Sequence, residues 1–376
     1  MKIPFNKPYT TGNELAYIEQ ALYSRQLAGG GPFTKKCVAW LERSADCHKA
    51  LLTHSCTAAL EMAALLADIQ PGDEIIMPSY TFVSTANAFV LRGGVPVFVD
   101  IREDTLNIDE TKIESAITDR TKAIVPVHYA GVGCEMDTIM TLAAKYGLLV
   151  IEDAAQGVMA AYKGRPLGSI GHLAAFSFHE TKNIVSGEGG ALLVNDPRFA
   201  DRAEYLLEKG TNRSQFFRGE VNKYLWVDLG SSFLASEITA ACLYAQLEAE
   251  EAITQQRLEV WNHYHSTLEP LEKSGILRRP IIPPECQHNA HMYYLLLPDP
   301  EKRSRFIDDL NKRGIATVFH YIPLDSAPMG QKVSRGVDSL AKTHDLSDRL
   351  VRLPLWVGVE DHLATIIDAI ERWAIS

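Results

Sequence analysis

Short apolar segments alternate with segments of helical periodicity along the first half of the chain. The apolar segments are rich in β-branched residues and are bounded by Gly, Pro or Asp, a pattern typical of buried strands. They span residues 50–53, 74–77, 95–99, 123–127, 148–151, 174–178 and 191–194. Helical patterns lie between them, for example at residues 58–68, 84–91 and 136–145. This alternation predicts an α/β fold whose mostly parallel seven-stranded sheet is covered by helices on both faces.

The pattern changes in the last third of the chain. A helical stretch rich in Ala, Glu, Gln and Leu runs from about residue 236 to about 271, and a Pro-rich stretch at 280–284 follows it. Beyond it we expect a strand at 292–297, a helix at 303–312, a strand at 316–319 and an amphipathic helix at 361–374. Because single cores stop growing near ~250–300 residues, a chain of 376 residues should form two domains. We expect an N-terminal arm and large domain over 1–250, and a smaller α+β domain over 251–376.

Composition excludes several classes of protein. The formal net charge of -10 opposes binding to a polyanion, so nucleic acid is not an expected partner. The first residues form no apolar signal core, and no apolar run approaches the ~20 residues that span a bilayer, so we expect a cytoplasmic protein without a membrane partner. Six scattered cysteines have no paired metal spacing, and His288 and His291 have no third ligand nearby. We expect no metal.

Two polar residues follow apolar segments at positions where chemistry is expected. Lys182 comes shortly after the segment that ends at Phe178, and Gly187, Gly189 and Gly190 follow it. An amine on a loop that glycines can turn is typical of a Schiff-base lysine, although a surface lysine is the simpler alternative. Asp153 follows the segment 148–151, at the edge of the sheet where α/β proteins bind ligands. The alternative for Asp153 is a helix cap. Together they predict a bound heteroaromatic aldehyde.

Several segments together carry a family resemblance, and their order and spacing match along nearly the whole chain. These segments are residues 55–60, 78–82, 152–156 and 176–190. They resemble the nucleotide-sugar aminotransferases of the DegT/DnrJ/EryC1/StrS type, which are pyridoxal-phosphate (PLP) enzymes. The resemblance implies PLP-dependent transferase fold type I, as in aspartate aminotransferase.

The resemblance also implies roles for residues around the cofactor ring. Lys182 is then the catalytic Schiff-base lysine and proton shuttle, and Asp153 pairs with the pyridine nitrogen so that the ring accepts electrons. Gln156 would reach the phenolic oxygen of the cofactor, with a solvent-facing amide as the alternative. Phe82 would stack on the ring, with an ordinary core phenylalanine as the alternative.

A phosphate site is implied where the first strand runs into an alanine-rich helix. Free N–H groups and the helix dipole converge at Ser55, Cys56 and Thr57, and Ser177 would add a hydroxyl. An ordinary helix cap is the alternative. The chain departs from the family twice: Cys56 stands where most relatives have Gly, and Ser232 stands where relatives usually have an Asn that reaches the phosphate of the neighbouring subunit.

Substrate-binding residues are expected in two segments. Lys209, Arg213 and Arg218 alternate with aromatic residues, a composition that suits the diphosphate and base of a dTDP-sugar. A solvated loop is the alternative. His320 and Tyr321 resemble a family segment near the sugar, although a buried histidine at a strand end is also compatible.

The resemblance implies a reaction as well. An amino group would pass from L-glutamate to the C4 ketone of dTDP-4-dehydro-6-deoxy-D-glucose, giving dTDP-4-amino-4,6-dideoxy-D-galactose, as in enterobacterial common antigen biosynthesis. The family implies a homodimer with shared active sites. The alternatives are a different nucleotide keto-sugar or a gluco product, a PLP-dependent sugar dehydratase with His in place of Lys, and a non-catalytic nucleotide-sugar sensor. A nicotinamide dehydrogenase is disfavoured because no G-x-G-x-x-G follows the first strand.

Overall fold

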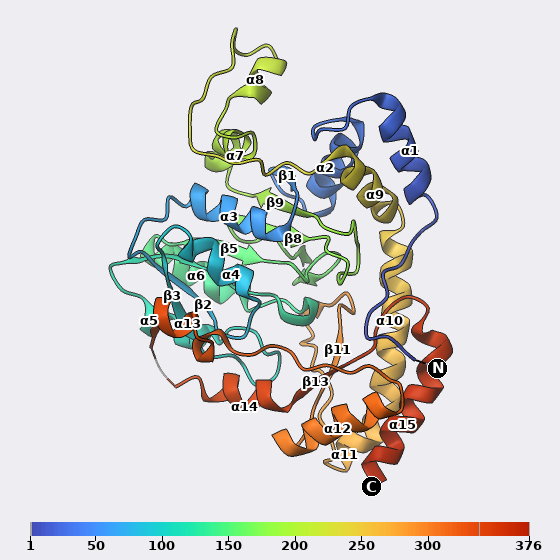
Figure 1. Cartoon of the computed structure of the whole chain (residues 1–376). Coiled ribbons are helices and arrows are strands. Elements are labelled where there is room, and N and C mark those ends of the chain that lie inside the picture. Colours follow the sequence, from blue (N-terminus) through green and yellow to red (C-terminus); the bar gives the residue numbers. More distant parts are fainter. Residues whose placement is uncertain (1, 338, 376) are drawn as a thin grey trace.

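The computed structural model describes residues 2–337 and 339–375, and its centre is an eight-stranded sheet with helices on both faces (Figure 1). In spatial order the strands are β1 (Lys49–Thr53), β9 (Gly190–Val194), β8 (Leu173–Ser177), β5 (Leu149–Asp153), β4 (Thr121–Ile124), β2 (Glu74–Pro78), β3 (Val95–Val99) and β12 (Arg335–Gly336). Strand β9 is antiparallel to both of its neighbours, and the other pairs are parallel. The seven predicted strands are confirmed. The two-residue edge strand β12 was not predicted because it is too short to carry a pattern.

Alternate residues of the strands pack against opposite layers of helices. In β2, Ile75 and Met77 belong to the core formed with α3 (Cys56–Leu66) and α4 (Val83–Val90). Ile76 belongs to the core on the other face, with α6 (Met136–Tyr146). All three side chains are fully buried. Because successive side chains of a strand point to opposite faces, a strand covered on both faces has to be apolar throughout.

The first helix after β1 begins at the carboxyl edge of the sheet. Ser55 is extended, and its Oγ accepts a hydrogen bond of 3.1 Å from the N–H of Ala58, so it caps α3. The helix is rich in Ala and Leu, and its buried face packs on β8 and β9. The N–H groups of its first turn are therefore held next to the ends of the neighbouring strands.

The prediction of a single helix over residues 236–271 is wrong. Three helices occupy this region: α9 (Glu237–Leu247), α10 (Glu250–Thr267) and α11 (Glu269–Lys273). The chain turns at Ala249, which has φ -113° and ψ 11°. Side chains of α9 are buried beside the large sheet with α1 (Glu14–Ser24) and α2 (Pro32–Ser44), whereas most of α10 packs in the C-terminal core. The break exists because the two parts of the stretch pack against different cores.

The C-terminal core lies between a small sheet and three long helices. Strand β11 (Tyr293–Leu296) pairs antiparallel with β13 (Leu350–Leu353), and α10, α12 (Pro300–Lys312) and α15 (Leu363–Ile375) pack around them. The expected strand at 316–319 is reduced to one bridge between Val318 and Arg352. Both chain ends lie beside α10 and α15 (Figure 1), and Ile3 of the N-terminal arm belongs to this core. We keep the division between residues 250 and 251 as a proposed domain boundary.

Shorter elements complete the described part of the chain. They are α5 (Ile113–Ala116), β6 (Ala161–Tyr162), β7 (Arg165–Pro166), α7 (Ala200–Leu207), α8 (Arg213–Phe217), β10 (Cys286–Gln287), α13 (Gly330–Val333) and α14 (Ala341–Arg349), together with 3₁₀ turns at Glu110–Lys112, Tyr129–Gly131, Pro197–Phe199, Leu324–Ser326 and Val359–His362. Among the described residues, no helix combines the length and the apolar character needed to cross a membrane.

Candidate active site

A cavity of about 420 Å³ opens at the carboxyl ends of β1, β5 and β8, where the large sheet faces the C-terminal core. Most of the residues that we predicted from the sequence line it. They are Ser55, Cys56, Thr57, Phe82, Asp153, Gln156, Ser177, Lys182, His320 and Tyr321. Parallel strands bring their carboxyl ends to one edge, so segments more than 100 residues apart in sequence meet here.

Asp153 is the last residue of β5, and its carboxylate is held by neutral donors. Oδ2 accepts a hydrogen bond of 2.7 Å from the hydroxyl of Thr85 on α4, and Oδ1 accepts one of 3.2 Å from the N–H of Ala155. Thr85 in turn lies 2.7 Å, between hydroxyl oxygens, from Thr81. None of the described cations forms an ion pair with this buried carboxylate, so its charge remains available to a cationic group in the cavity.

Lys182 lies on the loop after β8, and its Nζ has no hydrogen-bond or ion-pair partner among the described residues. Burial lowers the pKa of Lys182; the negative charges of Cys56, when ionised, and Asp153 oppose this shift, and Arg352 adds to it. A lowered pKa increases the fraction of neutral, nucleophilic amine. The next residue, Asn183, fixes the loop through a hydrogen bond of 2.8 Å to the carbonyl of Asn289.

Gln156, Tyr321 and His320 form a polar wall of the cavity. The Oε1 atom of Gln156 accepts a hydrogen bond of 2.7 Å from the N–H of Ala130, and its Nε2 lies 3.4 Å from the Tyr321 hydroxyl. The Nδ1 atom of His320 lies 3.0 Å from the hydroxyl of Tyr129. Phe82 is 57% exposed and lines the cavity, so it is not a core phenylalanine.

The N-terminus of α3 brings backbone N–H groups and hydroxyl groups to the cavity. Thr57 Oγ1 lies 2.8 Å from Ser84 Oγ, and the Oγ of Ser177 lies 3.4 Å from the N–H of His179. Gly190 packs so tightly against this turn that a Cβ there would lie 2.4 Å from the backbone nitrogen of Cys56. Cys56 is the first residue of α3 and has no positive φ, so replacing the Gly of relatives by Cys creates no backbone strain here.

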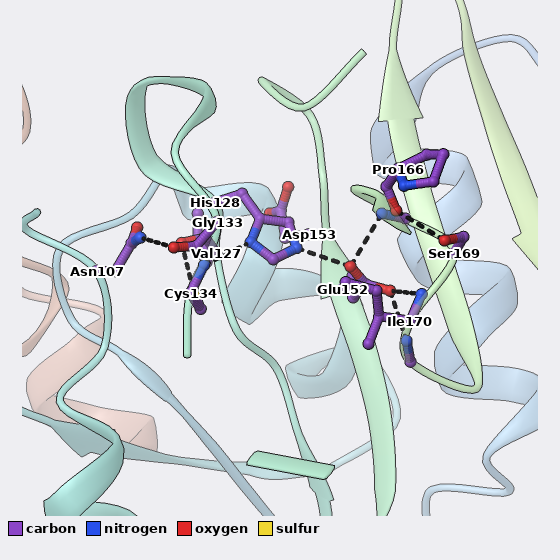
Figure 2. A network of polar contacts seen from close by, with 12 residues as sticks. Asn107, Val127, His128, Gly133, Cys134, Glu152, Asp153, Pro166, Ser169 and Ile170 are labelled. Carbon is purple, nitrogen blue, oxygen red and sulfur yellow. Dashed lines mark hydrogen bonds and ion pairs between the residues drawn. The ribbon is translucent and has the colours of Figure 1, made fainter. Parts of the chain in front are cut away.

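Behind Asp153, a buried carboxylate ties the end of β5 to two loops (Figure 2). Glu152 accepts hydrogen bonds from His128 Nε2 at 2.8 Å and from the N–H groups of Gly168, Ile170 and Gly171 at 2.9, 2.8 and 2.6 Å. Glu152 therefore points to the face of the sheet opposite to the cavity. Since His128 N–H also donates to the Asp153 carbonyl at 3.2 Å, this network positions the backbone of Asp153.

We expect Glu152→Gln to lower the free energy of unfolding by about 3–5 kcal/mol at neutral pH, because the amide cannot replace a carboxylate surrounded by N–H donors. Burial alone raises the pKa of Glu152, but the hydrogen bond and charge of His128 and the N–H groups of Gly171 and Gly168 bring it below its ordinary value. The carboxylate therefore stabilises the fold above its unfolded pKa, and this contribution is lost as pH falls through the lower folded pKa.

Urea unfolding as a function of pH checks this prediction. The difference between wild type and variant should begin to shrink as pH falls below roughly 4, the ordinary pKa of a glutamate in the unfolded chain, and should disappear as pH falls through the lower pKa of folded Glu152. Glu114→Gln, a surface carboxylate that pairs with Lys145, is the control and should change stability little. An equal effect of the two substitutions would contradict the role of Glu152.

The structure does not bring every predicted residue to the cavity. Lys209 and Ser232 are exposed on neighbouring loop segments, while Arg213 pairs with Glu208 and Arg218 with Glu204 and Glu220. Lys209, Arg213 and Arg218 do not line the cavity of a single chain, because their segment leads away from the sheet edge and two of the cations already have partners. Their role in substrate binding stays a prediction.

The histidines considered for a metal have other partners. The His288 ring lies 4.4 Å from the Trp261 ring, between centroids, and Nδ1 of His291 lies 3.0 Å from Oδ1 of Asn183. Within the described part of the chain, no group of three or more His, Cys, Asp or Glu residues is arranged to hold a metal ion.

Sequence reasoning missed several residues of the cavity. Thr85 was missed because a threonine in a helical pattern carries no signal of its contact with a strand 68 residues away. Arg257 and Arg352 also line the cavity. For Arg352 a signal exists in the sequence, since it is the one charged residue in the apolar segment Leu350–Leu353.

The mostly parallel sheet, with a cavity at the carboxyl ends of its strands, has the architecture of fold type I of the PLP-dependent transferases, and solved aminotransferases share it. The family model of the DegT/DnrJ/EryC1/StrS aminotransferases matches residues 8–371, and the chain belongs to this family. The spore coat polysaccharide biosynthesis protein SpsC of Bacillus subtilis is 33% identical over 380 residues, which cover 98% of this chain and 96% of SpsC.

Two solved structures extend the comparison. PseC of Helicobacter pylori, an aminotransferase involved in the biosynthesis of pseudoaminic acid, superposes with a TM-score of 0.90 at 25% identity, with 100% of both chains covered. NtdA of Bacillus subtilis, with bound cofactor PMP, superposes with a TM-score of 0.89 at 26% identity, covering 100% of this chain and 86% of NtdA. The resemblance to the family that the sequence segments indicated is therefore confirmed.

Proposed function

We propose that this sugar aminotransferase moves an amino group from L-glutamate to the C4 ketone of dTDP-4-dehydro-6-deoxy-D-glucose and forms dTDP-4-amino-4,6-dideoxy-D-galactose. The observation that carries the aminotransferase part is the presence in one cavity of an amine without a partner among the described residues, Lys182, and of a carboxylate held only by neutral donors, Asp153. Relatives with solved structures include PLP and PMP forms, and the cofactor of this enzyme is pyridoxal 5′-phosphate.

The residues of the cavity fit this cofactor. Lys182 and Asp153 would hold its aldehyde carbon and its ring nitrogen, and Gln156 its phenolic oxygen. Phe82 would lie on the ring. The cradle made by the N-terminus of α3 with Ser55, Thr57 and Ser177 offers N–H and hydroxyl donors to the phosphate. The bound cofactor supplies an electron sink for the carbanion that forms when the donor loses its Cα proton.

The side chains of this chain then have separate tasks. Burial lowers the pKa of Lys182, so in its neutral form this amine would accept the Cα proton of the amino donor and would pass a proton on to the cofactor. Asp153, oriented by Thr85, keeps the ring nitrogen protonated through a charge-assisted hydrogen bond. His320 and Tyr321 line the same cavity and would contact the sugar.

The named sugar rests on the resemblance of the sequence, and product analysis tests it. The holoenzyme is incubated with dTDP-4-dehydro-6-deoxy-D-glucose and L-glutamate, and the sugar is characterised by mass spectrometry and NMR. We expect a 4-amino sugar whose small H3–H4 coupling indicates the galacto configuration. A large H3–H4 coupling would instead indicate the gluco product, and a deoxygenated sugar would favour the dehydratase. Absence of any conversion of glutamate would favour the nucleotide-sugar sensor.

We also propose a homodimer. Large apolar side chains are exposed on the segment that contains α8, with Phe217 68% and Trp226 79% exposed, and Figure 1 shows this segment projecting from the body. Exposed apolar patches of this kind are typical of interfaces. A second copy that covers this segment would bring Ser232 near the phosphate site of its partner. Light scattering that gives the mass of one chain would contradict the dimer.

The cytoplasm is the compartment that we propose. The six cysteines are free thiols, as expected in a reducing environment. Labelling of thiols in intact cells and after lysis would test this assignment.

A further inference from the structure

Asn289 lies between β10 and β11 and ties its own segment to the loop after β5. It is 1% exposed, and both polar groups of its side chain are hydrogen-bonded. Its Nδ2 donates to the carbonyl oxygens of Gln156 and Val158 at 2.8 and 2.7 Å, and its Oδ1 accepts from the N–H of His291 at 3.0 Å. Gly131 packs against the same amide so closely that a Cβ there would clash with it. Such an amide fixes the segments that it joins, because each lost bond would leave a buried polar group unpaired.

Asn183, the residue after Lys182, is bound to the same segment. Its Nδ2 donates to the Asn289 carbonyl oxygen at 2.8 Å, so its Oδ1 is turned toward Nδ1 of His291, 3.0 Å away. An amide oxygen only accepts, and therefore Nδ1 carries the proton of the His291 ring. Burial lowers the pKa of His291, and the positive charges of Lys182 and Arg352 act in the same direction, so the ring stays neutral. The amide and the ring thus form a matched donor and acceptor.

These contacts determine where the backbone of Lys182 lies. Asn183, Asn289 and His291 are each at most 7% exposed, and we call them the amide–histidine cluster. The cluster links the loop of Lys182 to the loop of Gln156, the residue assigned to the phenolic oxygen of the cofactor. The amine of Lys182 has no partner of its own among the described residues, so its position depends on how this backbone is held. A displacement of about 1 Å can change a rate about 10²-fold.

Of the three residues of the cluster, His291 lines the cavity, whereas Asn183 and Asn289 do not. A substitution of Asn183 can therefore alter the chemistry only through its neighbours. We propose that the amide–histidine cluster positions Lys182 relative to Gln156 for the proton transfers in both halves of the reaction. This inference rests on the proposed function and adds positioning residues to it.

The test compares Asn183→Ala, His291→Leu and His291→Asn with the wild type. In His291→Asn the amide nitrogen can replace the ring Nδ1 as a donor to Asn183, whereas leucine has no donor. Single-turnover absorbance gives the rate of conversion of the holoenzyme to its pyridoxamine form by glutamate, and the rate of return with the nucleotide keto-sugar. A pH titration of the absorbance of lysine-bound cofactor, without substrates, reports on the surroundings of Lys182 independently of turnover. Urea unfolding of the apoprotein measures stability.

Asn195→Ala is the matched control. Asn195 follows β9 and does not line the cavity, and its Nδ2 donates to the carbonyl oxygens of Gly168 and Gly171 at 2.9 and 2.8 Å. Its replacement also removes an amide that bonds to backbone carbonyl groups, so it should lower stability much as Asn183→Ala does. The two rates and the titration should stay as in the wild type.

For Asn183→Ala and His291→Leu we expect both rates to fall on the order of 10- to 100-fold, with the substrate concentrations for half-maximal rate changed by less than about threefold. The titration of lysine-bound cofactor should shift by about 0.5 pH units or more, because the displaced Lys182 meets different charges and donors. His291→Asn should recover most of both effects. The two His291 variants decide the question if Asn183→Ala does not fold.

Two results would overturn the inference. One is wild-type rates and titration in Asn183→Ala and His291→Leu in spite of reduced stability, which would leave the cluster a structural role alone. The other is a defect confined to one half-reaction, or to the His291 variants, which would assign His291 to direct contact with a substrate. Failure of the proposed function looks different: the titration of lysine-bound cofactor would still shift in Asn183→Ala, but glutamate would not convert the wild type.

Discussion

Replacing Lys182 with alanine should remove the visible absorbance of lysine-bound cofactor and lower turnover by at least about 10³-fold. The variant loses both the covalent attachment and the base that moves the proton, and no other lysine lines the cavity among the described residues. The absorbance spectrum after reconstitution with PLP and the single-turnover rate with glutamate check this prediction.

Lys145→Ala is the matched control for Lys182→Ala. Lys145 is exposed on α6 and pairs with Glu114, so its loss should leave both the spectrum and the rate unchanged. Cofactor retained by non-covalent contacts in Lys182→Ala would agree with the site described above, whereas turnover near that of the wild type would reject Lys182 as the catalytic residue.

The second large effect is expected for Asp153→Asn. The amide has nearly the same shape, so PLP should still bind, but the negative charge opposite the ring nitrogen is lost. Breaking a buried charge pair costs about 3–5 kcal/mol, which corresponds to a loss of about 10²–10⁴-fold in the rate of proton transfer. Rapid-mixing absorbance with glutamate measures this rate, and equilibrium dialysis measures the retained cofactor.

Two further variants sharpen the result for Asp153. Thr85→Val removes one hydrogen bond to the carboxylate and should produce a smaller defect of about tenfold or more. Asp137→Asn changes a surface carboxylate that pairs with Lys163 and Arg165, and it should have no effect on the rate. If Asp153→Asn transferred protons as fast as the wild type, the ring nitrogen would not depend on this residue.

Much of the fold was predictable because strands buried on both faces leave a local signature. Each of the seven apolar segments became a strand within three residues of its expected bounds, since a residue on either face of the large sheet meets a helix layer. The sequence wrongly predicted one continuous helix over residues 236–271 because helical propensity is a local property. The turn at Ala249 depends on which core each half contacts, and composition carries no information about that.

The candidate site was predictable where a residue lies at the end of a strand or on the loop that follows it, as with Asp153 and Lys182. It was less predictable where a long segment could lead either toward or away from the cavity. Lys209, Arg213 and Arg218 have the composition of a phosphate-binding loop, but Glu208, Glu204 and Glu220 pair with two of them away from the sheet edge. Arg352 shows the opposite case: its sequence signal is a single charge in an apolar segment, and the tertiary structure places it in the cavity.

The sequence by itself determined the class of fold and the family, and it indicated the two residues proposed for the central chemistry, because strand patterns and strand-end residues are encoded over a few consecutive positions. Only the tertiary structure decided which other side chains share the cavity. Thr85 meets Asp153 across 68 residues, and Arg257 and Arg352 arrive from an α-helix and a strand of the C-terminal core. Whether a charge is neutralised or left open to a ligand depends on such distant partners, since electrostatic interactions act through space and not along the chain.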